Sequence, residues 1–244
     1  EKITLIDNVK SYLFEELIAR ISDIIDPSQI DILIQNHVEM DHSGGLPKTL
    51  ELLPNATLYT NAAGIKGLKL HYKKDWNFAE IKSGDTLKLG KRSLTFLTTP
   101  MVHWPDNMVT YCHEEEILFS NDAFGQHIAS SERLARELPI GIVLEEAKKY
   151  YANIVLPYSK QVQKVLDAAA PLSIKMICPS HGVIWTEENI PLILKAYKDW
   201  AYNVSDGHNG LVIYDTMWKS TQMIAVAIHE TFEKLGIRKK LLNL

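Results

Sequence analysis

The feature that most constrains this chain is a run of four potential metal ligands within six residues, His37-Val-Glu39-Met-Asp41-His42. The run follows Ile30 to Gln35, a short apolar stretch that predicts a buried strand. Open α/β sheets place their binding sites just beyond the carboxyl ends of strands. A loop at that place can turn all four side chains toward one point, although a hydrogen-bonded turn is an alternative explanation for the run alone.

Three further imidazole or carboxylate side chains each lie beside a predicted strand and a turn. They are His103 in Thr99-Pro-Met-Val-His-Trp-Pro105, Asp122 in Phe119-Ser-Asn-Asp122, and His181 in Ile177-Cys-Pro-Ser-His-Gly182. Imidazole and carboxylate donors on separate loops are the components of a metal centre that is assembled by folding. We therefore expect four segments, distant from one another in sequence, to supply ligands to one centre.

The order of these residues resembles the flavodiiron protein family. H-x-E-x-D-H is followed by a histidine, an aspartate and a histidine at intervals of about sixty, twenty and sixty residues. The stretch His103-Trp-Pro-Asp106, the region Lys148 to Lys160 and Pro179-Ser-His-Gly182 are similar to the same family. The resemblance covers nearly the whole chain. It implies an α/β chain (an α+β sandwich) with a metallo-β-lactamase-like αββα fold, followed by the first strand and helix of a flavodoxin-like domain.

The order of predicted elements indicates the same architecture. A strand, helix, strand unit opens the chain, short strands follow between Phe78 and Ser120, and a long helical region runs from about Val143 to Ala169. Two mixed sheets covered by helices is the arrangement that this order suggests. We expect residues 1–204 to form the di-iron domain, with its N-terminal start missing.

A polar, glycine-bearing segment, Ser205-Asp-Gly-His-Asn-Gly210, predicts a linker. Behind it we expect a strand at Leu211 to Tyr214 and a helix at Ser220 to Leu235, with Arg238-Lys-Lys240 as solvated charge. A single strand and helix cannot bury their own apolar faces. We therefore expect residues 205–244 to be a linker and the truncated beginning of a flavodoxin-like FMN-binding domain.

The resemblance implies a role for each ligand in a non-haem di-iron centre. His37, Glu39 and His103 would bind the first iron, and Asp41, His42 and His181 the second, with Asp122 bridging both. The role of His42 stays open, because the resemblance allows it either to bind iron or to leave that ligand position to water. In related zinc hydrolases a histidine stands where this chain has Glu39, and hard oxygen donors suit iron better than redox-silent zinc.

The implied activity is that of an oxidoreductase that reduces dioxygen to water, nitric oxide to nitrous oxide, or both, using these seven residues as its catalytic centre. The role would be detoxification, with electrons delivered through FMN. The electron donor would be rubredoxin, a reduced deazaflavin or a nicotinamide-linked reductase. The family resemblance also implies a head-to-tail homodimer.

An FMN-phosphate loop of the flavodoxin type is implied by Tyr214-Asp-Thr-Met-Trp-Lys-Ser-Thr221, which lies between the predicted strand and helix. Hydroxyl and backbone donors at a helix start can hold a phosphate. The side chains of Thr216, Ser220 and Thr221 would then contact FMN, and Met217, Trp218 and Lys219 would contribute their backbone. As a bare pattern, the same hydroxyls are more often a helix cap.

Composition excludes several classes of function. With 30 acidic and 26 basic residues the formal net charge is −4, and no basic block is present, which argues against a nucleic-acid or anionic-membrane partner. No apolar run approaches the ~18 residues of a membrane span, and no signal-peptide pattern is present. Two cysteines are too few for a disulfide framework. We expect a cytoplasmic protein.

Two other functions compete with the oxidoreductase. One is a zinc-dependent hydrolase of the metallo-β-lactamase fold, in which a metal-bound hydroxide attacks an ester or amide. The other is an inactive scaffold or electron-transfer module with a vestigial pocket. Elemental analysis distinguishes iron, zinc and no metal. Outside the ligand pattern, Tyr150 could hydrogen-bond near the metals, but we expect it to be a core residue. We expect the remaining histidines to be surface or helix residues, although His127 could reach the surroundings of the ligands: His71, His113, His127, His208 and His229.

Overall fold

The computed structural model describes residues 1–204 and 207–244. The chain divides into two compact units, Glu1–Tyr202 and Asn203–Leu244. Ser205 and Asp206, which belong to the predicted linker, lie outside the described residues. Among the helices that are described, none is long and apolar enough to span a bilayer.

The first sheet of the large unit is wholly parallel and has the order β1-β2-β3-β4. Its strands are β1 (Thr4–Ile6), β2 (Ile32–Ile34), β3 (Thr57–Asn61) and β4 (Phe78–Ile81). The connections run through α1 (Phe14–Ser22), then α2 (Met40–Ser43) and α3 (Leu46–Leu52), then α4 (Ala62–Tyr72). The expectation of a mixed sheet is wrong here, because each connection is a helical crossover, and crossovers of that kind join parallel strands.

The second sheet is mixed, as expected, and has the order β10-β9-β8-β7-β6-β5. Its strands are β5 (Thr86–Lys88), β6 (Ser93–Thr98), β7 (Met108–Cys112), β8 (Ile117–Asn121), β9 (Met176–Pro179) and β10 (Trp185–Thr186). Neighbouring strands are antiparallel except β8 and β9, which are parallel. The long helical region connects β8 to β9, which explains the one parallel pair.

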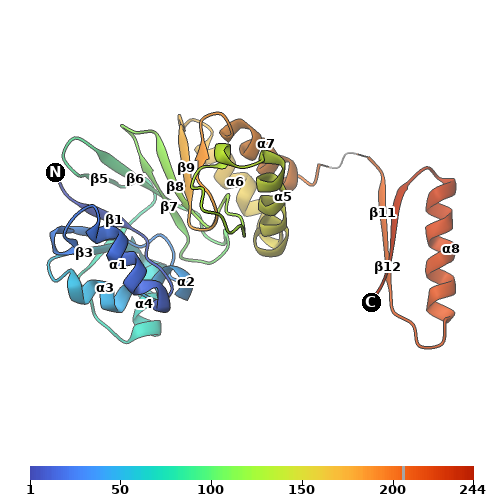
Figure 1. Cartoon of the computed structure of the whole chain (residues 1–244), viewed down its shortest axis with the longest axis horizontal. Coiled ribbons are helices and arrows are strands. Elements are labelled where there is room, and N and C mark those ends of the chain that lie inside the picture. The colour runs from blue at the N-terminus through green and yellow to red at the C-terminus, as the bar shows by residue number, and fades with distance from the viewer. Residues whose placement is uncertain (205–206) are drawn as a thin grey trace. The chain divides into compact units, whose positions relative to one another are not determined.

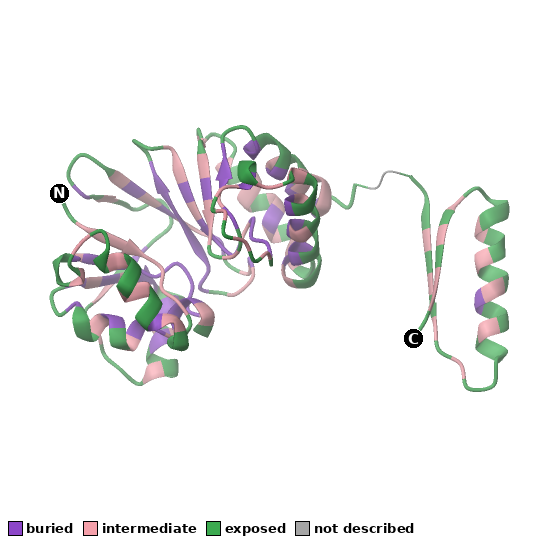
Figure 2. Cartoon of the chain, viewed as in Figure 1, coloured by how far each residue is buried: buried purple, intermediate pink, exposed green. Residues whose placement is uncertain are grey.

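Helices cover the outer faces of both sheets, so the large unit has four layers (Figure 1). Leu33 and Leu58 of the first sheet pack with Leu46 and Leu68 of α3 and α4, whereas Ile32 and Ile34 belong to a core shared with Phe96 and Met108 of the second sheet. This alternation along β2 follows from the two-residue period of a strand. Figure 2 shows buried positions concentrated along the sheets and on the inner sides of the helices.

The helical region that the sequence predicts is present but is not one continuous α-helix. It consists of α5 (Ile140–Tyr150), a π-helical turn (Tyr151–Val155), a short 3-10 turn (Leu156–Tyr158) and α6 (Ser159–Ala169). Pro157 stands at the break, where its missing N–H and fixed ring oppose a regular helix. A third core lies between the second sheet and α5, α6 and α7 (Ile190–Ala201).

The small unit contains β11 (Asn209–Tyr214), α8 (Ser220–Lys234) and β12 (Arg238–Asn243), with the two strands parallel. Arg238 and Lys240 are exposed, as expected, but they also begin β12, whose strand pattern their charge conceals. Lys239 differs, because it is half-buried and pairs with Glu233. Part of the apolar surface of α8 is exposed, as expected for so small a unit: Met223 is 72% exposed. Ala225 is buried, and the Phe232 ring packs on Gly210.

Candidate metal centre

The seven predicted ligands lie together at one edge of the large unit, beyond the carboxyl ends of strands from both sheets. His37 and Glu39 follow β2, Asp41 and His42 lie in α2, His103 follows β6, Asp122 follows β8, and His181 follows β9. Two sheets packed face to face bring strand ends that are distant in sequence to the same edge. The side chains meet in two groups that share Asp122.

The first group consists of His37, Glu39 and His103. Glu39 Oε2 lies 3.4 Å from the Nε2 atoms of both histidines. Asp122 Oδ2 lies 3.6 Å from His37 Nε2 and 3.4 Å from His103 Nε2. The His37 side chain is completely buried, whereas the Glu39 side chain is 37% exposed, so this group is open to solvent on the Glu39 side.

The second group consists of Asp41, His42 and His181. Asp41 Oδ2 lies 3.5 Å from His42 Nε2 and 3.3 Å from His181 Nε2. Asp122 Oδ1 lies 3.1 Å from each of these two nitrogens. The buried Asp122 carboxylate therefore presents Oδ2 to the first group and Oδ1 to the second.

Unpartnered buried atoms show that these residues fit metal ions. Asp41 Oδ1, His42 Nε2 and Asp122 Oδ2 are buried and make no hydrogen bond within the described parts of the chain. His42 Nε2 is close to Asp122 but makes no well-aligned hydrogen bond with it. This is expected if both side chains point at a metal ion between them. Burial of unpartnered polar atoms is costly, and a bound cation would remove that cost. In each group the three ligand atoms lie within 4.8 Å of one another.

The electrostatics of the cluster keep Asp41 and Asp122 ionised. Burial would raise the pKa of Asp122, but its contacts with His103, His181 and His42 outweigh burial and hold that pKa well below the usual range. Burial would lower the pKa of His37, but its hydrogen bonds to Asp106 and Glu39 raise it to about 10. Contacts with Asp122 and Asp41 likewise overcome burial and raise the pKa of His181 to about 9. The ionised carboxylates thus hold protons on His37 and His181, and a metal ion binding there would displace those protons.

Two buried residues hold the first ligand loop in place. The side-chain nitrogen Nε2 of Gln35 donates to the backbone oxygens of His37 and His42, at 2.6 and 2.8 Å. Asp106 Oδ2 accepts from His37 Nδ1 and from the Val38 amide, both at 2.8 Å. Gln35 thus holds the loop at both ends, and Asp106 orients the His37 imidazole within it.

Gln126 connects the Asp122 loop to the His181 loop. Its side-chain nitrogen donates to the Phe124 oxygen at 2.7 Å, and its side-chain oxygen accepts from the Val183 amide at 2.7 Å. Its backbone N–H donates to the His181 oxygen at 3.1 Å. Gly182 permits this packing, since a Cβ atom there would clash with Gln126 Oε1.

Tyr150 contacts the cluster directly. It is a buried residue of α5, as predicted, but its hydroxyl also donates to Asp122 Oδ1 at 3.0 Å. Burial and the neighbouring Asp122 charge both raise the pKa of this hydroxyl, so it stays protonated. Tyr150 is therefore both a core aromatic, as expected, and a hydrogen-bond donor to a predicted metal ligand, the alternative that the sequence leaves open.

Sequence reasoning missed the supporting roles of Gln35, Asp106 and Gln126. Asp106 has a usable signal, because it is a carboxylate three residues beyond His103 in the same short loop. The two glutamines have no comparable signal, since buried amides are recognised by partners that only folding supplies. Among the other histidines, His127 lies beside the cluster, with its ring centroid 5.9 Å from that of His181, and it is exposed.

Comparison with known proteins identifies the family. A model described as ODP family beta lactamase matches residues 1–182. The chain belongs to this family. The nitric oxide reductase of Moorella thermoacetica is 43% identical over 247 residues, which cover 100% of this chain and 61% of the relative.

Solved structures of flavodiiron proteins resemble this ODP chain closely. Rubredoxin oxygen:oxidoreductase from Desulfovibrio gigas has a TM-score of 0.91 at 38% identity, covering 98% of this chain and 61% of the other. The flavodiiron protein from Giardia intestinalis also has a TM-score of 0.91, at 35% identity, covering 98% of this chain and 59% of the other. The predicted flavodiiron resemblance and metallo-β-lactamase-like α/β fold are confirmed, and the chain spans about three fifths of these relatives.

The predicted FMN loop of this ODP chain lies between β11 and α8. Thr216, Met217, Trp218 and Lys219 precede the helix, and Ser220 and Thr221 begin it. Met217 and Trp218 are each 84% exposed, and Lys219 has a left-handed backbone with φ of 64°. Thr216 Oγ1 is buried with no hydrogen-bond partner in the described residues, and no side chain caps α8. FMN contacts for these six residues stay a prediction.

Proposed function

We propose that this chain carries the di-iron centre of a flavodiiron oxidoreductase that reduces dioxygen to water, nitric oxide to nitrous oxide, or both. The observation that carries the proposal is the Asp122 carboxylate, whose two oxygens face two separate groups of ligands. The names of relatives support both gases, since one is a nitric oxide reductase and another a rubredoxin oxygen:oxidoreductase.

Iron would be held by the seven clustered side chains. His37, Glu39 and His103 would take the first ion, and Asp41, His42 and His181 the second, with Asp122 bridging. Two iron ions bound there would supply adjacent positions at which a diatomic molecule gains electrons. Three carboxylates in the set favour iron over the zinc of a hydrolase, because hard oxygen donors stabilise the ferric state.

The chain's own residues orient this centre and hold a proton beside it. Asp106 accepts the Nδ1 hydrogen of His37 and so leaves Nε2 as the ligand atom. The Tyr150 hydroxyl keeps its hydrogen and donates it to Asp122 Oδ1. The partly exposed Glu39 and His103 side chains mark the side from which electrons would arrive.

Electrons would reach the centre through FMN. The loop Thr216 to Thr221 is proposed to hold the flavin phosphate, supported by its place at the start of α8 and by the unpartnered Thr216 hydroxyl. With an FMN-phosphate loop there, residues 205–244 would be a linker and the beginning of a flavodoxin-like domain. Rubredoxin, a reduced deazaflavin or a reductase would supply electrons, and a head-to-tail homodimer would bring one subunit's flavin near the other's iron. Light scattering of the intact protein tests the dimer.

The proposed role is detoxification in the cytoplasm. Dioxygen takes four electrons and four protons to give two waters, and two nitric oxide molecules take two electrons and two protons to give nitrous oxide and one water. Cys112 and Cys178 are unpaired, which agrees with a reducing compartment. Cell fractionation tests the location.

The deciding experiment loads the chain anaerobically with ferrous iron, verifies about two ions per chain, and supplies chemically reduced FMN. Electrodes then follow dioxygen and nitric oxide, with zinc-loaded protein as the background. Consumption of at least one gas above that background is the expected result. Iron-loaded protein that consumes neither gas contradicts the proposal, and ester or amide cleavage by the zinc-loaded form would favour the hydrolase instead.

A further inference from the structure

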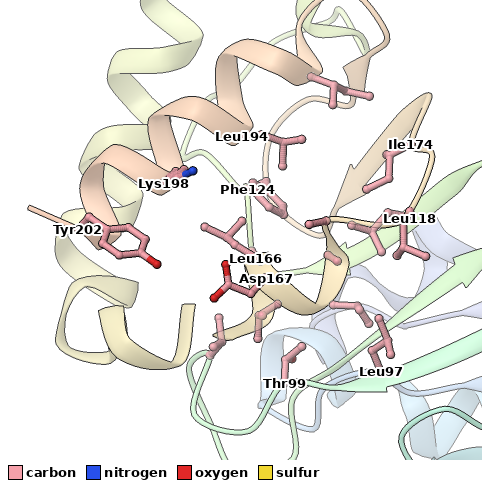
Figure 3. A pocket seen from close by; sticks show the side chains of 18 residues that line it. Leu97, Thr99, Leu118, Phe124, Leu166, Asp167, Ile174, Leu194, Lys198 and Tyr202 are labelled. Atoms are coloured by element: carbon pink, nitrogen blue, oxygen red, sulfur yellow. The ribbon is translucent and has the colours of Figure 1, made fainter. Parts of the chain in front are cut away.

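An apolar pocket lies between the second sheet and the helices α6 and α7, within the large unit. Its volume is about 360 Å³. Figure 3 shows the aliphatic side chains of Leu97, Leu118 and Ile174 on one side of it, and Asp167, Lys198 and Tyr202 gathered on the other. These last three residues are exposed and form the mouth, whereas Leu118 is 4% exposed and lies deep.

The deep wall of the pocket is formed by chain neighbours of two metal ligands. Val102 immediately precedes His103, and Ala123 and Phe124 immediately follow Asp122. Val102 is 5% exposed and Phe124 is 7% exposed, so both are buried residues of the pocket wall. The Phe124 amide donates to Tyr197 Oη at 2.6 Å, which fixes this wall to α7. The pocket thus reaches the backbone that carries both a ligand of the first group and the shared carboxylate.

The chemistry of the lining selects small apolar molecules. Leucine, valine, isoleucine, alanine and phenylalanine supply most of the wall, and Thr99 is the polar exception among its buried residues. Cavities lined in this way stay dry and bind small apolar solutes such as xenon. Polar or charged substrates would lose hydration there without gaining partners.

We propose that this pocket is a binding site for an apolar diatomic gas, from which gas reaches the centre past Val102 and Phe124. The proposal rests on the proposed function for the identity of the gas. It accounts for a large apolar space beside a cluster of ionised ligands, where a gas can accumulate without displacing ordered water. Dioxygen and nitric oxide share this chemistry.

The first test detects the gas in the pocket without any turnover. In the zinc-loaded chain, dissolved dioxygen is paramagnetic and accelerates the relaxation of methyl groups that it contacts. Val102, Val109 and Leu118 line the pocket, and Ile32, Ile81 and Leu94 are equally buried elsewhere. We expect the pocket methyls to relax several times faster than this control set under dioxygen. Equal relaxation in the two sets overturns the binding site.

The second test fills the pocket from α7. Leu194→Trp places a large ring in it, while Leu192→Trp on the same helix is the matched control, because Leu192 is 45% exposed and does not line the pocket. We expect only Leu194→Trp to remove the dioxygen effect at Val102 and to raise the KM for gas about threefold in iron-loaded protein, with kcat less changed. Leu166→Phe is the second filling variant.

The outcomes separate this inference from the proposed function. If the wild-type iron-loaded chain consumes neither gas, the proposed function fails, while the relaxation experiment still decides whether the pocket binds gas. If Leu194→Trp and Leu166→Phe both remove the relaxation effect but leave the KM for gas unchanged, the pocket does not supply the centre and the inference is overturned.

Discussion

Asp106 and His37, sixty-nine positions apart in sequence, are joined by a hydrogen bond of 2.8 Å between Asp106 Oδ2 and His37 Nδ1. A carboxylate can only accept, so Nδ1 carries the hydrogen and Nε2 is directed at Glu39 and Asp122. Asp106→Asn should weaken metal binding by about 10- to 100-fold, because the orienting acceptor is changed. Calorimetric titration with zinc measures the effect. Asp75→Asn, at an 84% exposed side chain, is the control, and equal affinities in the two variants would contradict the orienting role.

Asp122 and His42 should differ in how many metal ions depend on them. Asp122 contacts both groups, whereas the ion pairs of His42 Nε2 among the described residues are with Asp41 and Asp122. We expect Asp122→Ala to lose both ions during dialysis, and His42→Ala to retain the ion of the first group. Metal content per folded chain is measured by elemental analysis. Equal retention in the two variants would speak against a bridging carboxylate.

Gly182 should tolerate no side chain. It has a φ of 84°, and a Cβ atom would meet Gln126 Oε1 and the Gln126 backbone oxygen. Gly182→Ala is expected to lower the free energy of unfolding by at least about 1–3 kcal/mol, since a left-handed alanine is strained before the clash is added. Urea denaturation of the metal-free chain measures this.

Gly141 supplies the matched control for that substitution. It lies in α5 with nothing within 4 Å of a Cβ atom. Gly141→Ala should stabilise the chain by about 0.5–1 kcal/mol, because alanine favours helix. A Gly182→Ala variant as stable as Gly141→Ala would mean that Gln126 yields easily and does not hold the His181 loop.

Tyr150 should contribute more stability through its hydroxyl than Tyr151 does. Tyr150 donates to the ionised Asp122, whereas Tyr151 shares a hydrogen bond of 2.9 Å with Ser159. Tyr150→Phe should lower the free energy of unfolding by about 1.5–3 kcal/mol and Tyr151→Phe by about 0.5–1.5 kcal/mol, since bonds to charged groups are stronger. Urea denaturation of both metal-free variants tests the order, and a larger loss in Tyr151→Phe would reverse it.

The sequence by itself determined which side chains could bind metal and where each would lie along the fold. His37, Glu39, Asp41 and His42 are adjacent in the chain, and His103, Asp122 and His181 follow strands whose local patterns are readable. Such positions depend on short-range periodicity and turns, so they could be predicted without knowing what packs against them.

Only the tertiary structure decided how those side chains meet and what holds them. It assigned the two Asp122 oxygens to different groups, brought Asp106 to His37, placed Gln126 between two loops, and brought the hydroxyl of the core residue Tyr150 to Asp122. It also made the first sheet parallel and revealed β12 behind a charged start. These features depend on approach between residues far apart in sequence, where packing and hydrogen-bond geometry, rather than local propensity, determine the outcome.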